Sequence, residues 1–283
     1  MSTNSVKAGV SPLRLVIHGG AGAIKRSKLT TERAQAYQQA LAQSLTAGYA
    51  VLASGGSSID AVIAAIVVME DSPLFNAGKG SVFSHAGRNE LEASIMDGTT
   101  LMAGAVAAVT TIRNPIRAAY TVMTKSAHVM LMGQGAEAFA AEQGLEIVDP
   151  SYFYTQKRWD QLQQAIAEER VLRDHDAGPG TPVAVSATGT GEMFIRAAAA
   201  FNTAAQVRLL HKPIAEAADN TLAEIAAIGG DGGLIVLDAK GDYAMRFNTS
   251  GMYRGVIGND GIARVGIFLE AETPVTCSPA SAL

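Results

Sequence analysis

The chain has 283 residues, of which 48% are hydrophobic and 17% charged. A chain of this length buries roughly three quarters of its unfolded surface, so it needs no disulfide framework, and its single cysteine, Cys277, could not form one. The 22 basic and 26 acidic residues give a net charge of −4 without a long run of like charges. This balance argues against nucleic acid and anionic membrane surfaces as partners.

The N-terminal region contains no targeting or membrane-spanning pattern. The longest apolar stretch, 61–69, is far shorter than the ~18 residues that span a bilayer. Residues 1–12 are polar and lack the apolar segment of a signal peptide. We therefore expect a cytoplasmic protein with a disordered N-terminus at 1–12 and a single domain at 13–283.

The first half alternates short apolar runs with segments of helical periodicity. A glycine-rich segment at 18–22 predicts a turn directly after the first strand. Asn114 and Pro115 are typical of a helix start, with asparagine as the cap and proline at the first helical position. The patterns predict strands at 13–17, 90–96 and 104–109, and helices at 31–54, 61–69, 116–125, 136–143 and 151–169.

The second half begins after a linker at 171–180, which contains the sequence Asp-Ala-Gly-Pro-Gly. Helices then occur in pairs between groups of strands, which favours helical layers on sheet faces over strict βαβ alternation. We therefore expect an α+β layered sandwich. The predicted elements are a strand at 182–187, helices at 192–207 and 214–228, a hairpin of 234–237 with 243–247, and a last strand at 264–269.

Glycine turns that follow strands could bind phosphate, but the known phosphate-binding motifs are absent from the sequence. The segments starting at Gly20 and Gly189 lack the third glycine of the dinucleotide fingerprint. The chain also has no Gly-x-Ser-x-Gly elbow and no His-Glu-x-x-His motif. His18 and His128 lie beside apolar residues, so we predict core positions for both rather than catalytic ones.

The turn Thr-Gly-Thr-Gly-Glu at 188–192 allows two interpretations. Its hydroxyl groups and backbone N–H groups at a helix start could bind a substrate carboxylate or stabilise an oxyanion. Alternatively, Thr188 simply caps the helix that begins near Gly191. The sequence leaves both interpretations open.

Six segments together resemble one family, the isoaspartyl peptidase/L-asparaginase family of N-terminal-nucleophile hydrolases, which includes the plant-type asparaginases. Their order and spacing match over most of the chain, which is far more specific than any single glycine turn. The segments are 15–22 (LVIHGGAG), 73–80 (PLFNAGKG), 96–98 (MDG), 103–106 (AGAV), 188–192 (TGTGE) and 247–254 (FNTSGMYR).

The resemblance implies an αββα sandwich that is made as a precursor and cleaves itself at a Gly–Thr bond. The new N-terminal threonine would act as nucleophile with its own α-amine as base, since an α-amine titrates near 8. Expected substrates are β-aspartyl dipeptides and L-asparagine, and the expected assembly is a homodimer of αβ units. On this scheme 13–170 corresponds to the α subunit and 181–283 to a shortened β subunit.

The resemblance also implies specific binding residues. The substrate and oxyanion segment would comprise Thr188, Gly189, Thr190 and Gly191, with Asn76 near the nucleophile. No organic cofactor is expected, but one loop matches the family's sodium-binding loop, where a hard monovalent cation is held by backbone oxygens. The expected sodium ligands are the carbonyl groups of Met69, Glu70, Ser72, Phe75, Ala77 and Lys79.

One part of the family pattern has no counterpart in this sequence. In the family the linker leads into the strand that carries the nucleophile, then into a threonine-rich segment and an arginine-containing clamp for the substrate carboxylate. Here residues 176–180 run directly into Thr181 and the Val-Ala-Val-Ser strand. We therefore predict an impaired hydrolase with central strands missing, or alternatively a non-catalytic remnant that binds small amino acids or serves assembly. Loss of strands would also expose a sheet edge that invites association.

A third hypothesis is that Gly180 and Thr181 form a substitute cleavage site. The dipeptide is the required one, and it lies between a linker and a strand. Against this, Pro182 restricts Thr181 to extended geometry and removes an N–H group beside the nucleophile. Thr181 is also the residue expected before this strand in an intact relative.

Overall fold

The computed structural model describes residues 12–22, 24–167 and 183–275. The linker at 171–180 and Thr181 lie outside the described residues, as do most of 1–12. In the first part of the chain the elements are β1 (Arg14–Gly22), α1 (Thr31–Ala53), α2 (Ser58–Glu70), β2 (Leu91–Met96), β3 (Ala103–Val109), α3 (Pro115–Lys125), β4 (Met130–Met132), α4 (Gly133–Glu142) and α5 (Gln156–Ala167).

The second part contains three helices and most of the strands of the two facing sheets. Its helices are α6 (Gly191–Arg196), α7 (Ala199–Leu210) and α8 (Ile214–Ala227). Its strands are β5 (Val183–Gly189), β6 (Gly232–Asp238), β7 (Tyr243–Phe247), β8 (Gly251–Gly258), β9 (Arg264–Gly266) and β10 (Thr273–Pro274).

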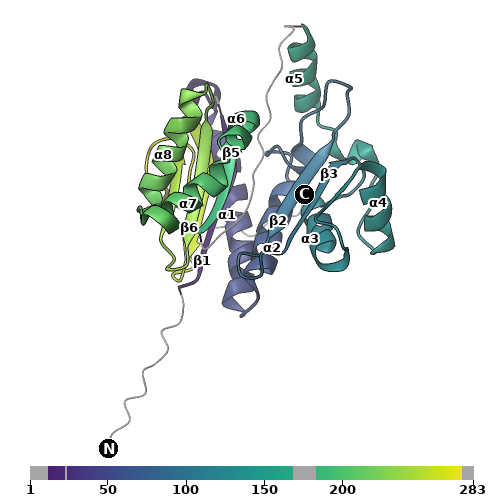
Figure 1. Cartoon of the computed structure of the whole chain (residues 1–283). Helices are drawn as coiled ribbons and strands as arrows, with labels where there is room; N and C mark the ends of the chain where they lie inside the picture. Colours follow the sequence, from purple (N-terminus) through teal and green to yellow (C-terminus); the bar gives the residue numbers. More distant parts are fainter. Residues whose placement is uncertain (1–11, 23, 168–182, 276–283) are drawn as a thin grey trace, which may run out of the picture.

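Four layers form the larger part of the molecule (Figure 1). Helices α1 and α2 cover one face of the antiparallel sheet β1-β8-β9-β10, and α7 and α8 cover the outer face of the sheet β5-β6-β7. The inner faces of the two sheets meet around Ala21, Ile235 and Met252. This arrangement confirms the predicted αββα layering.

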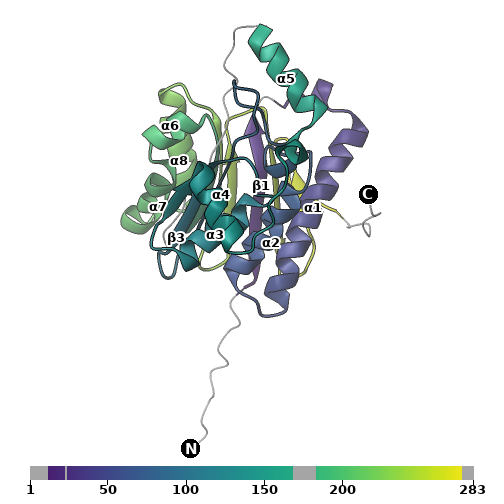
Figure 2. The ribbon, with the colours of Figure 1, turned by 90° about the vertical axis from the view of Figure 1, so that its right-hand side faces the viewer.

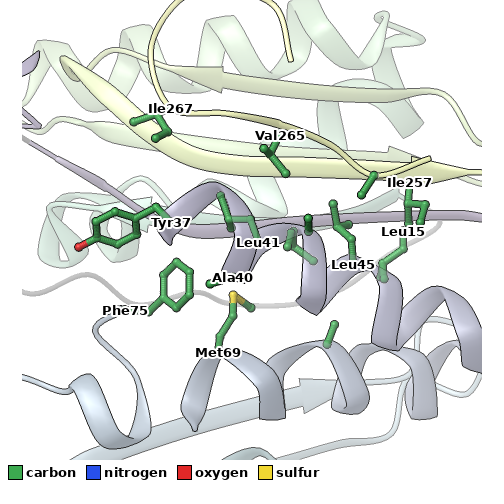
Figure 3. Close-up of a cluster of buried hydrophobic side chains, with 14 residues drawn as sticks. Leu15, Tyr37, Ala40, Leu41, Leu45, Met69, Phe75, Ile257, Val265 and Ile267 are labelled. Carbon is green, nitrogen blue, oxygen red and sulfur yellow. The ribbon is translucent and has the colours of Figure 1, made fainter. Parts of the chain in front are cut away.

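The core between α1, α2 and the first sheet contains the largest cluster of buried side chains (Figure 3). Leu41 and Leu45 of α1 are fully buried against Ile257 and Val265 of the sheet. Tyr37 stacks on Tyr253 with ring centroids 4.2 Å apart. At about 25 cal/mol per Å² of buried apolar surface, such a cluster is a major source of folding free energy.

A third sheet, β2-β3-β4, lies beside these layers with α3 and α4 packed against it (Figure 2). It is joined to the rest mainly through α2, whose Ile63 is buried with Ile95 of β2 and Ile116 of α3. Helix α2 therefore packs on the first sheet with one face and on α3 and β2 with another. This explains why its sequence is apolar on nearly every side.

Local sequence signals account for the starts of the first two long helices. Thr30 caps α1 by accepting a hydrogen bond from the N–H of Arg33, and Ser57 caps α2 by accepting one from the N–H of Asp60. Each cap satisfies one of the backbone donors that the first turn leaves free. The predicted bounds of both helices differ from the observed ones by a few residues at most.

Two local predictions were wrong, and one strand was missed. The segment at 18–22 is not a turn: β1 continues through it, with a register shift between His18 and Ala21 where it pairs with β8. The helix predicted at 192–207 is two helices, separated at Ala198, which has a φ of 45°. The helix start at Asn114 and Pro115 is confirmed, although the Asn114 side chain donates to Asp71 and makes no cap hydrogen bond. Strand β8 was not predicted, since glycines interrupt its pattern.

Within the described residues, no helix combines the length and the apolar character that a membrane crossing requires.

Candidate functional site

The predicted substrate turn connects β5 to α6 beside the start of β6. The Thr188 hydroxyl accepts a hydrogen bond from the N–H of Ala21, 3.1 Å away in the irregular part of β1. Both residues are buried. Thr188 therefore joins the two facing sheets, and the alternative that it caps the next helix is wrong, because the residue at the cap position is Thr190.

Thr190 is held by the loop before β6. Its hydroxyl donates to a carboxylate oxygen of Asp231 over 2.7 Å, and its backbone N–H donates to the Asp231 carbonyl, also over 2.7 Å. Gly189 has a φ of +153°, and a Cβ at this position would lie 2.3 Å from the same carbonyl oxygen. Asp231, which sequence reasoning missed, is thus what fixes the Thr188–Gly191 turn, and only glycine fits at 189.

Asn76 lies on an exposed part of the loop after α2, and its Oδ1 accepts a hydrogen bond from the N–H of Val82 over 2.8 Å. The neighbouring Phe75 is buried against β1, where a Cβ on Gly19 would lie 2.5 Å from the Phe75 ring. On the other side, the Ser250 hydroxyl donates to the carbonyl of Gly22 over 3.2 Å. The irregular part of β1 therefore brings the loop, the Thr188 turn and the segment at 247–254 together.

In the predicted sodium loop, the backbone passes so close to Gly78 and Gly80 that neither position has room for a Cβ atom. Gly78 has a φ of +48°, and a Cβ there would lie 2.2 Å from the carbonyl oxygen of Glu70. A Cβ on Gly80 would lie 2.1 Å from the carbonyl oxygen of Phe75. These two predicted ligands therefore have their carbonyl oxygens turned into the loop, which fits a cation held by main-chain oxygens.

Other predicted ligands of the loop take part in its own turns. The carbonyl of Met69 accepts from the N–H of Ser72 over 3.2 Å, and that of Ala77 accepts from the N–H of Gly80 over 3.1 Å. Each carbonyl oxygen has two lone pairs, so these bonds leave capacity for an ion. Lys79 lies over the ring of Tyr152, with its Nζ 5.5 Å from the ring centroid.

Side chains at the start of the loop anchor it to α3. The carboxyl group of Glu70 is buried and accepts from the N–H of Ile116 over 3.0 Å, and burial raises its pKa to about 8. Asp71 receives hydrogen bonds from Asn114 and Tyr152 and an ion pair from Arg113. No sequence pattern indicates this anchor, because Asp71 is separated from Asn114 and Tyr152 by 43 and 81 positions.

A cavity of about 500 Å³ lies between the layers. Its lining comes from β1, α2, β2, β5 and β6, and most of it is apolar. His18 and Ser186 are polar groups in this lining, and His18 Nε2 lies 2.8 Å from Ser186 Oγ. Neither Asn76 nor Thr188 lines it.

The two histidines predicted as core residues differ in the structure. His18 is half-buried, and desolvation lowers the pKa of its imidazole to about 4, so it is neutral near pH 7. Its Nδ1 is buried and has no hydrogen-bond partner among the described residues. His128 is exposed, so the prediction for that residue was wrong.

Arg254, the last residue of the sixth segment, is buried, and its side chain is held by contacts within the protein. Its guanidinium pairs with Glu272 over 2.6 Å and donates to the carbonyl groups of Phe268 and Glu270. Within the same segment, Asn248 accepts from the N–H of Gly232 over 2.7 Å through its side-chain oxygen. Arg254 therefore binds the chain that follows β9, and Asn248 binds the first residue of β6.

Comparison with known proteins agrees with the motifs. The family model described as asparaginase matches residues 11–182 and 177–267. The chain belongs to the isoaspartyl peptidase/L-asparaginase family. It is 39% identical to the isoaspartyl peptidase of Escherichia coli K12, with 85% of this chain and 91% of that protein covered. It is 32% identical to the human isoaspartyl peptidase/L-asparaginase, with 86% and 92% covered. Its fold is therefore that of the N-terminal-nucleophile hydrolases.

The comparisons also locate an interruption. The alignment with the Escherichia coli relative runs over 292 positions although only 85% of the 283 residues take part, so dozens of its positions face no residue of this chain. A relative from Dictyostelium discoideum aligns over 320 positions with 86% of the chain. The two stretches of the family match meet at 177–182, just before β5, which is where the motif order indicates a missing segment.

Within the described residues, no cluster of three or more His, Cys, Asp or Glu side chains is suited to hold a metal ion.

Proposed function

We propose that this chain is a hydrolase of the family by descent, with β-aspartyl dipeptides and L-asparagine as its substrate class, and that hydrolysis is impaired because the nucleophile segment is absent. The observation that carries the proposal is the family match divided at 177–182. Relatives that align with 85% and 86% of this chain are named isoaspartyl peptidase and isoaspartyl peptidase/L-asparaginase.

The chemistry of the described groups supports impairment. Acyl transfer requires a nucleophile with a base that can take its proton near neutral pH. The hydroxyl groups of Thr188 and Thr190 are engaged with Ala21 and Asp231, and His18, with a pKa of about 4, is a weak base. These groups can position a ligand, but they do not form the pair that starts catalysis.

We further propose that the chain keeps the residues that bind the substrate in the family. The turn of Thr188, Gly189, Thr190 and Gly191 would face the substrate, and Asn76 would lie near the reacting carbonyl group. We also propose that the loop holds a sodium ion through the carbonyl groups of the six residues from Met69 to Lys79 named above, since its glycines turn carbonyl oxygens inward. The ion would stiffen the loop that carries Asn76.

A test begins with the purified 29.3 kDa chain. After prolonged incubation we expect one band on a denaturing gel and no ammonia from L-asparagine. A second chain carries the missing segment of the Escherichia coli relative after Gly180, and we expect it to yield two fragments and to release ammonia. Its control replaces the threonine of the inserted Gly–Thr bond by alanine and should stay uncut and inactive.

Cleavage before Thr181 in the unaltered chain, together with ammonia release, would contradict this proposal and support Thr181 as a nucleophile. The alternative function, a non-catalytic module that binds small amino acids, is favoured by the intact turn between Thr190 and Asp231. Titration calorimetry with L-aspartate tests this alternative, because the absence of any heat of binding would contradict it.

A further inference from the structure

Three strands that border the cavity have an open edge. In the described sheets, β1, β2 and β5 each stand at the end of a strand order and pair on one side only. Each contributes residues to the cavity lining, among them Ile17 of β1, Ile95 of β2 and Val185 of β5. An open edge presents unpaired N–H and C=O groups and is a template for another strand.

The lining is suited to the side chains of an extended segment. Ala184 of β5 is exposed although it stands in an apolar strand, and Val16, Ile235 and Ile66 add apolar surface from the two sheets and α2. The volume of about 500 Å³ lies within the roughly 300–1,000 Å³ typical of ligand pockets. Apolar side chains of an added strand would remove this surface from water.

A polar group in the lining also lacks a partner. His18 Nδ1 is buried and unpaired among the described residues, whereas Nε2 is bonded to Ser186. A buried polar atom without a hydrogen bond is unfavourable, because it has lost its contact with water. A peptide lying in the cavity could supply the missing partner from its backbone.

We propose that this cavity is a docking site for an extended peptide that adds a strand to the open edge of β5, and that its occupant is the family segment absent from this chain. The break in the family match immediately precedes β5, and dozens of positions of the Escherichia coli relative have no residue here. The absent segment therefore belongs next in the chain to a strand whose edge is open. Strand addition of this kind uses main-chain hydrogen bonds for affinity and alternate side chains for specificity.

The test uses the full chain and a fluorescent synthetic peptide with the residues of the Escherichia coli isoaspartyl peptidase that face the gap. We expect saturable binding by fluorescence anisotropy. Hydrogen exchange should slow at the amides of β5 in the complex. The proposal rests on the absent segment of the function proposed above, but binding requires no hydrolysis, so a failure to bind and a failure to restore hydrolysis are separate results.

Two variants and one peptide serve as controls. Ala184→Asp places a charge in the lining at an exposed position, and we expect it to weaken peptide binding at least tenfold. Ala239→Asp makes the same change in the exposed turn between β6 and β7 and should leave binding unchanged. Circular dichroism verifies that both variants fold.

Several results would overturn the proposal. They are equal binding of a scrambled peptide, equal loss of binding in both variants, or no binding at all. If the chain is dimeric and the β5 amides are protected from exchange before peptide is added, the open edge of β5 pairs with a second copy of the chain instead.

Discussion

Thr188 and His18, two residues of the family motifs, make hydrogen bonds that join strands β1 and β5. The Thr188 hydroxyl accepts the N–H of Ala21, and this N–H belongs to the part of β1 where the strand pairing is irregular. His18, three positions earlier, is bonded to Ser186 of β5. Both contacts join β1 to β5, so residues 168 and 167 positions apart hold the two sheets together.

The imidazole of His18 should make stability depend on pH. Its pKa is about 4 in the folded chain against an ordinary value of 6.5, so the unfolded chain binds the proton more readily. The contribution of neutral His18 to the free energy of unfolding is complete above pH 6.5 and is lost as the pH falls towards 4. The free energy of unfolding then changes by at most about 1.4 kcal/mol per pH unit. His18→Gln should flatten the curve of unfolding free energy in this window, as measured by urea denaturation.

His85 provides the matched control, since it is exposed in a loop. His85→Gln should leave the pH dependence of the unfolding free energy as it is in the unaltered chain. An unchanged slope in His18→Gln would show that the His18 imidazole is solvated in solution.

At the scale of elements, amphipathic periodicity predicted the helices well. It succeeded for α1 and α8, whose buried residues recur on faces that contact a sheet or another helix, whereas α2 was predicted from its cap and its continuous apolar run. It failed where the backbone geometry depends on neighbouring elements. Ala198 takes a left-handed conformation between α6 and α7. Strand β8 is buried along nearly its whole length, but its glycines interrupt the apolar pattern of a strand. No residue pattern within these segments signals either feature.

The close packing of α1 and α2 depends on Gly48. A Cβ on Gly48 would lie 2.5 Å from a methyl group of Leu15 and 2.7 Å from the carbonyl oxygen of Ala61. Because the second neighbour is backbone, we expect Gly48→Ala to lower the unfolding free energy by about 1–3 kcal/mol. Thermal unfolding followed by circular dichroism measures this loss.

The same substitution in α4 should have the opposite sign. Gly135 is helical, and a Cβ there would meet no atom within 4 Å. Gly135→Ala should raise the unfolding free energy by about 0.5–1 kcal/mol, because alanine loses less backbone entropy on folding. A gain of stability in Gly48→Ala would contradict the close approach of the two helices.

At the scale of the whole molecule, we propose that the chain forms a homodimer, as the resemblance implies for processed αβ units. Large apolar side chains are exposed on α6 and α7, including Ile195 at 78% and Phe201 at 60%. Exposed apolar surface of this kind is typical of contacts with other proteins. Size-exclusion chromatography with light scattering should give twice the mass of 29.3 kDa, and Phe201→Glu should shift it towards the monomer.

A dimer that persists in Phe201→Glu would place the contact elsewhere. Glu192→Lys changes the charge at an exposed position of α6 without removing apolar surface, so it should leave the mass unaltered.

The sequence by itself determined the family, the layered α+β fold and the position of the interruption before β5. These follow from motifs that keep their order along the chain, since local residue types fix turns, caps and apolar faces. Only the tertiary structure showed that Asp231 holds Thr190, that Asp71 gathers Arg113 and Asn114, and that β1, β2 and β5 leave open edges around one cavity. Such contacts join residues far apart in sequence, and packing alone decides which of them meet.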